Sequence, residues 1–292
     1  INTSTLKYLL SGLNPGAFRS NRCPSCAATT AEKVDRKWFH ALLQCTSCGL
    51  LYRWPGDTAK EMARFYQRDY RQAGLTTDLP DEQQLARLLS TGFSRTEKDF
   101  SRVIQLFDAL SLKRGSKVLD FGANWGYGVH QFIAAGYRSI GYELSVPRAV
   151  YAANLGVEVK PRCDEIEQSG PFDVVFSSHV LEHTPDPTAA ICRQLDVLRP
   201  DGTFIALVPN GSAAYRAADP NGFHKLWGQV HPVMLNDEFA INLFSGWNVA
   251  VGNCSEEDRR ALAGWRRNGL WRGTLDRDEL LIVATREPAA SG

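Results

Sequence analysis

The chain has 292 residues, of which 43% are hydrophobic and 22% are charged. This is close to ordinary globular usage and excludes a disordered, collagen-like or coiled-coil protein. The 33 lysines and arginines nearly balance the 32 aspartates and glutamates, so the net charge is only +1 and the chain lacks the overall positive field that non-specific nucleic-acid binding usually needs.

Two Cys-x-x-Cys pairs come first along the chain. Cys23 and Cys26 are separated from Cys45 and Cys48 by 18 residues, a spacing typical of four-cysteine zinc sites. Four thiolates satisfy the tetrahedral preference of zinc and leave no open position, so we expect a structural zinc ribbon within residues 1–56. A redox-active pair is the alternative, but two pairs at this spacing favour zinc. The odd total of seven cysteines argues against a disulfide scaffold and for a reducing compartment.

Residues 57–112 are predicted to form a helical linker or cap. Asp57 or Thr58 begins a helix that runs to residue 72, with apolar residues at helical spacing. Residues 81–112 carry a similar apolar stripe, which predicts one or two further amphipathic helices.

From residue 113 onward, short apolar runs alternate with helical stretches. This alternation predicts an α/β sheet with parallel strands and helices on both faces over residues 113–292. The expected strands are 117–121, 139–142, 157–159, 172–176, 203–208, 248–251 and 280–284. The expected helices lie near 126–135, 146–154, 187–198, 236–244 and 256–267. Residues 209–234 interrupt the alternation with Gly, Asn, Pro and aromatic residues, and we expect a long loop or lid there.

The segment Val118–Gly128 is the main candidate for a ligand site. An apolar strand ends at Asp120 and runs into a glycine-containing turn, which lets a ligand approach backbone N–H groups at the carboxyl end of the strand. The glycine spacing differs from the dinucleotide fingerprint, which counts against NAD. Glu143 ends the next strand, where a carboxylate can accept hydrogen bonds from both ribose hydroxyls of a nucleoside. Asp164 follows the third strand and is a candidate acceptor for an adenine amino group.

These motifs resemble the class I S-adenosylmethionine-dependent methyltransferases over residues 95–286. The matching residues are Asp120-x-Gly122-x-x-x-Gly126, Glu143, Phe172–Val175 leading into Ser178–His183, and Leu198–Phe204. The resemblance implies a Rossmann-like sheet of order 3-2-1-4-5-7-6 in which strand 7 is antiparallel. It also implies cofactor contacts at Asp120, Gly122, Ala123, Gly126, Glu143, Leu144, Asp164 and Ser178.

Asn124 departs from the family pattern, which usually has Gly at this position. Because Asn tolerates positive φ better than most residues, we expect the turn to survive. The zinc-ribbon cysteines and the segment that follows them resemble a bacterial subset of the family. That subset is associated with the modification of sugars, polysaccharides and secondary metabolites.

Methyl transfer needs an aligned nucleophile and often the removal of one proton. His183, after the fourth expected strand, and His231, in the 209–234 segment, are the first candidates for the base, because a histidine of near-neutral pKa can deprotonate a hydroxyl. His179, Glu182 and His183 also resemble the Glu-x-x-Glu-His metal site of some ubiquinone-pathway and small-RNA methyltransferases, with His in the first position. A divalent cation there would polarise an acceptor oxygen.

The sequence therefore predicts a methyltransferase that uses S-adenosylmethionine and structural zinc and acts on an oxygen of a sugar, a glycan precursor or a natural product. One alternative is an RNA methyltransferase that grips nucleic acid with its ribbon, which the net charge disfavours. The other is a non-catalytic interaction protein, suggested by Asn124. No stretch approaches the ~18 apolar residues of a membrane span, and no signal-peptide pattern is visible, so we expect a cytoplasmic protein without a membrane partner.

Overall fold

The structure is a computed structural model that describes residues 21–56, 78–265 and 268–286. The helix predicted over 57–72 therefore lies outside the described residues. Within the described ranges, no helix is long and apolar enough to cross a membrane.

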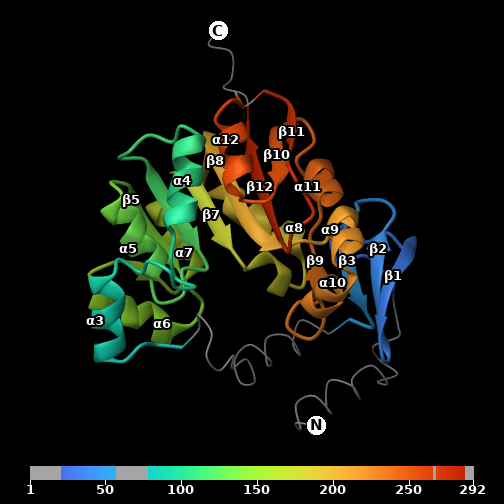
Figure 1. The fold of residues 1–292 in the computed structure, drawn as a ribbon, viewed down its shortest axis with the longest axis horizontal. Helices are drawn as coiled ribbons and strands as arrows, with labels where there is room; N and C mark the ends of the chain where they lie inside the picture. Colours follow the sequence, from blue (N-terminus) through green and yellow to red (C-terminus); the bar gives the residue numbers. More distant parts are fainter. Residues whose placement is uncertain (1–20, 57–77, 266–267, 287–292) are drawn as a thin grey trace.

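An eight-stranded sheet forms the centre of the molecule (Figure 1). In chain order its strands are β4 (Lys117–Phe121), β5 (Arg138–Tyr142), β6 (Val159–Lys160), β7 (Phe172–Ser178), β8 (Leu198–Pro209), β10 (Asn248–Gly252), β11 (Leu270–Arg272) and β12 (Glu279–Thr285). Their spatial order is β6-β5-β4-β7-β8-β12-β10-β11. β12 is antiparallel to β8 and β10, and the other neighbours are parallel. The expected order 3-2-1-4-5-7-6 with an antiparallel strand 7 is confirmed, and β11 is an additional edge strand that the sequence did not predict.

Helices cover both faces of this sheet. In chain order, the helices of the described residues are α3 (Glu82–Ser90), α4 (Ser101–Ala109), α5 (Tyr127–Ala134), α6 (Val146–Tyr151), α7 (Cys163–Ser169), α8 (Pro187–Asp196), α9 (Ala213–Ala218), α10 (Pro220–Leu226), α11 (Asp237–Leu243) and α12 (Glu256–Leu262). Of these, α9 and α10 pack with the ribbon strands described below. The same residues also contain the 3₁₀ turns η3 (Ala152–Leu155) and η4 (Leu181–His183). The stripe over residues 81–112 thus forms two helices, and the first begins with a capping box between Asp81 and Gln84.

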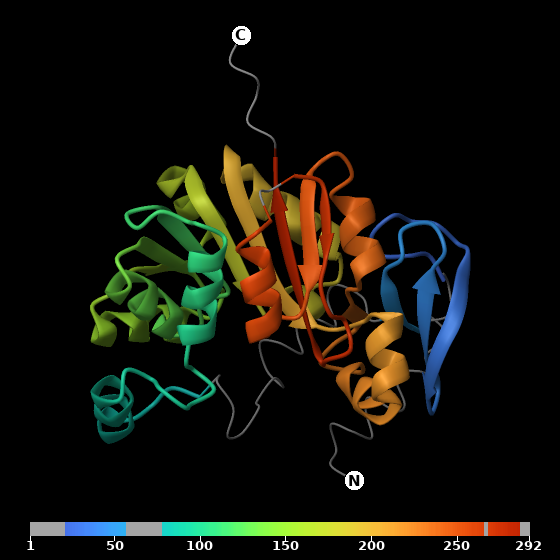
Figure 2. The ribbon, with the colours of Figure 1, turned by 45° about the horizontal axis from the view of Figure 1, so that its top comes forward.

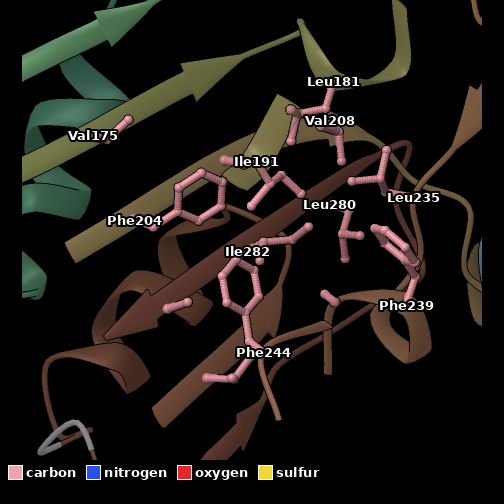
Figure 3. Close-up of a cluster of buried hydrophobic side chains, with 14 of the residues drawn as sticks. Val175, Leu181, Ile191, Phe204, Val208, Leu235, Phe239, Phe244, Leu280 and Ile282 are labelled. Carbon is pink, nitrogen blue, oxygen red and sulfur yellow. The ribbon is translucent and has the colours of Figure 1, made fainter. Parts of the chain in front are cut away.

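Two hydrophobic cores lie on opposite faces of the sheet, because successive strand residues point to opposite sides. Val118 belongs to the core that α4, α5 and α12 cover, and Leu119 belongs to the core that α7, α8 and α11 cover. In the second core, Phe204 and Ile282 from adjacent strands pack with Ile191 of α8 (Figure 3). Burying each such side chain contributes about 1.5–3 kcal/mol, so the apolar strands hold the sheet between its helices.

A second, smaller sheet contains the cysteine-rich residues. Its antiparallel order is β1 (Ala31–Lys37), β2 (His40–Cys45), β3 (Leu51–Trp54) and β9 (Val233–Met234). Figures 1 and 2 both show β1, β2 and β3, in blue, next to α9 and α10, in orange.

The 209–234 segment differs from the long loop that the sequence predicted. It contains α9, α10 and β9, and β9 is a strand of the ribbon sheet. Ser212 and Asp219 cap the two helices, which have six and seven residues. Helices this short carry too little apolar periodicity to be read from the sequence. A lid role for this segment stays a prediction.

Candidate cofactor and acceptor site

The turn between β4 and α5 is tied to the end of the neighbouring strand β5. The N–H groups of Gly122 and Ala123 both donate to the carbonyl of Tyr142 at 2.8 Å. Gly122 has a φ of 91°, and Asn124 has a φ of 53°, so Asn124 does adopt the left-handed conformation that the sequence analysis expected it to tolerate. A Cβ on Gly122 would lie 2.2 Å from a methyl of Val180, which comes just after β7. The turn therefore packs directly against the chain that leaves β7.

Two carboxylates flank this turn, the buried Asp120 and the half-buried Glu143. Glu143 accepts hydrogen bonds from the N–H of Asn124 at 3.1 Å and of Ser145 at 2.8 Å, and Arg148 lies 3.9 Å away. Burial, together with the charge of Glu143, raises the pKa of Asp120 to about 7. Burial also raises the pKa of Glu143, and its hydrogen-bond donors oppose that effect. Because an ionised carboxylate can accept about four hydrogen bonds, Glu143 keeps capacity for the two hydroxyls of a ribose.

The other predicted cofactor contacts differ in their exposure. Gly126 has a φ of 85° and begins α5, Ala123 is buried, and Ser178 ends β7. Leu144 is 72% exposed, which makes it available to cover a planar ligand group. Asp164 is exposed and forms a two-pronged pair with Arg162 at 2.9 and 2.8 Å. Its proposed contact with adenine stays a prediction.

The predicted chemical residues after β7 surround one buried carboxylate. The side chain of Glu182 is fully buried, and neither of its oxygens has a hydrogen-bond partner. Its Oε1 lies 3.3 Å from Nδ1 of His179 and 3.8 Å from Nε2 of His183. Potential ligand atoms of Glu182, His183 and His231 all lie within 4.8 Å of one another. The structure thus brings both first candidates for the base to the same place, although they are far apart in the chain.

Backbone carbonyls orient both histidine rings. Nδ1 of His183 lies 2.9 Å from the carbonyl of Val230, and Nδ1 of His231 lies 2.6 Å from that of Leu226. Because a carbonyl only accepts, Nδ1 carries the proton of each neutral ring, and the lone pair is on Nε2. Metal-ligating histidines are commonly oriented in this way. Burial lowers the pKa of His231 despite the nearby Glu182, which keeps this ring neutral at neutral pH.

His179 lies beside this cluster in a different electrostatic setting. Its φ is 53°, and its ring bridges Glu182 and Oε1 of Glu279, which is 3.4 Å from Nε2. Partial desolvation alone would favour the neutral ring, but the contacts with the two carboxylates raise the pKa of His179 to about 10, and its side chain is half exposed. A protonated ring cannot accept a proton, so this arrangement disfavours His179 as a base. The sequence predicted a metal site of His179, Glu182 and His183, whereas the structure groups the potential ligand atoms of Glu182, His183 and His231.

Glu279 and its partner Arg102 were not predicted from the sequence. Arg102 pairs with Glu279 at 2.7 Å across 177 positions of the chain. No local pattern points to such a pair, because it depends on β12 running beside β8 and on α4 covering the same edge.

The four ribbon cysteines converge on one point. Sγ of Cys23 lies 3.6 Å from that of Cys48, and Sγ of Cys26 lies 3.5 Å from that of Cys45. All four sulfurs lie within 4.8 Å of one another. Sulfurs at the ~2.3 Å bond length of zinc lie about 3.8 Å apart in a tetrahedron, so the cluster fits a single zinc ion.

Comparison with known proteins gives matches to methyltransferases. The sequence profile of the methyltransferase domain family matches residues 95–267, more than half of the chain. The ubiquinone biosynthesis O-methyltransferase of Xanthomonas axonopodis pv. citri is 33% identical over 115 residues, 36% of this chain and 48% of that protein. An uncharacterized methyltransferase of Mycobacteroides abscessus is 37% identical over 103 residues, 32% of this chain and 39% of that protein. The chain thus spans about half or less of the length of these curated relatives.

One similar solved structure is the plantazolicin methyltransferase BpumL in complex with a monoazolic desmethylPZN analog and SAH. The TM-score is 0.50 at 14% identity, covering 78% of this chain and 97% of that chain, which supports the fold alone. The strand order, the β4 turn and the match over residues 95–267 agree with one another. The chain belongs to the methyltransferase domain family and has the fold of the class I S-adenosylmethionine-dependent methyltransferases.

Proposed function

We propose that this chain transfers a methyl group from S-adenosylmethionine to an oxygen of a small molecule. The observation that carries the proposal is the group formed by the buried Glu182 and the half-buried His183 and His231, next to the cofactor-type turn. β7 pairs with β4, and Val180 contacts Gly122, so the group follows the strand adjacent to that turn. A methyl donor bound at the turn would therefore lie near Glu182, His183 and His231.

The chemistry of this group suits a hydroxyl acceptor. A neutral amine is already nucleophilic, whereas a hydroxyl gains reactivity when a base or a Lewis acid assists it. Without a cation, Nε2 of the neutral and oriented His231 can accept the hydroxyl proton. With a cation bound, that lone pair is a metal ligand, and the cation acidifies the hydroxyl so that water can take its proton. Several curated relatives are named ubiquinone biosynthesis O-methyltransferases, which supports oxygen of a small molecule as the acceptor.

The same side chains also fit a divalent cation. Glu182 offers a buried carboxylate whose Oε1 lies 3.3 Å from His179, and His183 and His231 carry their protons on the nitrogens that face backbone carbonyls. We propose that Glu182, His183 and His231 hold this cation and that the four ribbon cysteines hold structural zinc. Bound at this cluster, the cation would polarise the acceptor oxygen. The chain supplies the buried negative charge and the ring orientation.

The proposal is tested by incubating the full chain with S-adenosylmethionine and a panel of phenols, catechols and sugars. We expect release of S-adenosylhomocysteine with a small hydroxyl acceptor and a gain on addition of Mg²⁺ or Mn²⁺. Glu182→Gln should lower turnover by about 10²–10⁴-fold, because it removes the charge at the acceptor, while cofactor affinity stays the same. Glu158→Gln, at an exposed ion pair with Lys160, is the control and should match the parent. Methylation of RNA alone, or full turnover of Glu182→Gln, would contradict the proposal.

A further inference from the structure

The cysteine ribbon contributes backbone contacts to the segment that carries His231. β9 pairs with β3 through Leu51 with Met234 and Tyr52 with Val233. The N–H of Arg53 then donates to the carbonyl of Pro232 at 2.8 Å. The ribbon sheet therefore extends to the residue that immediately follows His231.

The buried side chain of Arg53 reaches further into the same segment. Its guanidinium donates to the carbonyl of Gly228 at 3.2 Å. The N–H of Gly228 donates to the carbonyl of His231 at 3.0 Å, and the ring of His231 is held by the carbonyl of Leu226. Arg53 thus contacts both ends of the loop 228–232. Its side chain binds Gly228 and its main chain binds Pro232, and this loop carries His231.

The β1 strand of the ribbon fixes the start of this loop. A single carboxylate oxygen of Asp35 accepts hydrogen bonds from Nδ1 of His224 at 2.8 Å and from Nε1 of Trp227 at 2.7 Å. The ammonium of Lys37 donates to the carbonyl of Trp227 and lies 4.7 Å from the centre of its ring. Trp227 itself is buried. These contacts join the ribbon to residues that are nearly 190 positions away in the chain.

We infer that the ribbon sets the position of His231, and that Asp35 and Arg53 are positioning residues for the acceptor centre. The inference rests on the proposed function, in which His231 belongs to that centre. It assigns the zinc ribbon a role inside the reaction site: holding residues 224–234 in place beside Glu182 and His183. This role by itself explains why β9, which follows His231, is a strand of the ribbon sheet.

The test compares Asp35→Ala with Glu32→Ala, a matched loss of a carboxylate from an exposed position of the same strand. Two measurements are made on the full, zinc-loaded chain. Hydrogen–deuterium exchange is followed in peptides that cover residues 224–235, and Mn²⁺ binding is followed by electron paramagnetic resonance. Mn²⁺ is the probe because it prefers oxygen ligands, such as the carboxylate of Glu182, to the thiolates of the ribbon.

We expect Asp35→Ala to speed exchange in residues 224–231 and to weaken Mn²⁺ binding by about 10–100-fold, the range seen when partners that orient metal ligands are lost. Asp35→Asn, which keeps one acceptor oxygen, should recover part of both effects, and Glu32→Ala should match the parent. In a His231→Ala background, Asp35→Ala should cause no further loss of Mn²⁺ affinity, because its effect passes through that ring.

The outcomes separate this inference from the proposed function. If the parent binds no Mn²⁺ but Asp35→Ala still speeds exchange in residues 224–231, the proposed cation site is refuted and the positioning role of Asp35 is supported. If the parent binds Mn²⁺ and Asp35→Ala matches Glu32→Ala in both measurements, the positioning role of Asp35 is refuted and the proposed cation site is supported. Faster exchange with unchanged Mn²⁺ affinity would also overturn the positioning of His231.

Discussion

Asp120 is a residue whose charge would favour ligand binding but lowers the stability of the fold. It is buried at the end of β4 near a second carboxylate, and both burial and that neighbour raise its pKa to about 7. A buried acid of this kind destabilises the fold once it ionises. Sites that break the rules of stable packing in this way are often functional, which agrees with a polar ligand at this turn.

Replacing Asp120 by Asn should stabilise the free protein at alkaline pH. The pKa of Asp120 is higher in the folded chain, about 7, than its usual unfolded value near 4, so folding takes up a proton between these pH values. The stability from the protonated acid is complete below about pH 4 and is lost as the pH rises through about 7, a difference of at most about 4 kcal/mol. We therefore expect the melting temperature of Asp120→Asn to exceed that of the parent at pH 8, with a smaller difference at pH 5.

Differential scanning calorimetry at the two pH values checks this prediction, with Glu158→Gln as the exposed control. A difference in melting temperature that is the same at pH 5 and pH 8 would show that Asp120 does not titrate as its burial implies. The comparison is made without cofactor, since a bound sulfonium would favour the ionised acid.

At the scale of elements, the ribbon and the helices α9 and α10 share a small core. Leu42 and Leu51 of the ribbon are buried with Tyr215, Phe223 and Trp227. The ribbon is too small to form a large core of its own, and domains of this size commonly depend on a metal. We therefore expect a zinc ion at the cysteine cluster to stabilise α9 and α10 as well as the ribbon strands.

Cys45→Ser should remove about one equivalent of zinc and lower the melting temperature, because the binding free energy of a structural zinc is folding free energy. Cys192→Ser is the matched control, since Cys192 is exposed on α8 and lies outside the cluster. The test measures the zinc content and the melting temperature of the parent and of both variants. A parent protein that is purified without zinc, or a Cys45→Ser variant that melts like the parent, would refute a structural zinc.

At the scale of the whole molecule, the parts that were predictable from the sequence depend on local patterns. Val118, Leu119 and Phe121 make the short segment before the glycine turn mostly apolar, which indicates a buried strand. Asp120 and Glu143 stand where the β4 and β5 strands end. The cysteine cluster was predictable because its spacing alone limits the geometry. The family resemblance then supplied the strand order.

The remaining features depend on contacts between distant residues. β9 has only two residues and becomes a strand because β3 provides its partner. β11, with three residues, likewise forms by pairing with β10. The contacts of Glu279 with His179 and Arg102 exist only after the sheet has assembled. Periodicity and spacing carry no signal for such pairs, so the acceptor side of the site could be predicted only as separate candidates.

The central claim is that the β4 turn and its two carboxylates bind S-adenosylmethionine, and calorimetric titration of the cofactor into the full chain tests it most directly. We predict binding by the parent and a loss of about 10–150-fold in affinity for Glu143→Ala, because one charge-assisted acceptor for the ribose contributes about 1.5–3 kcal/mol. Glu158→Ala, an exposed acid near the next strand, should bind like the parent. A folded parent that takes up no S-adenosylmethionine, or a Glu143→Ala variant with parent affinity, would contradict the account.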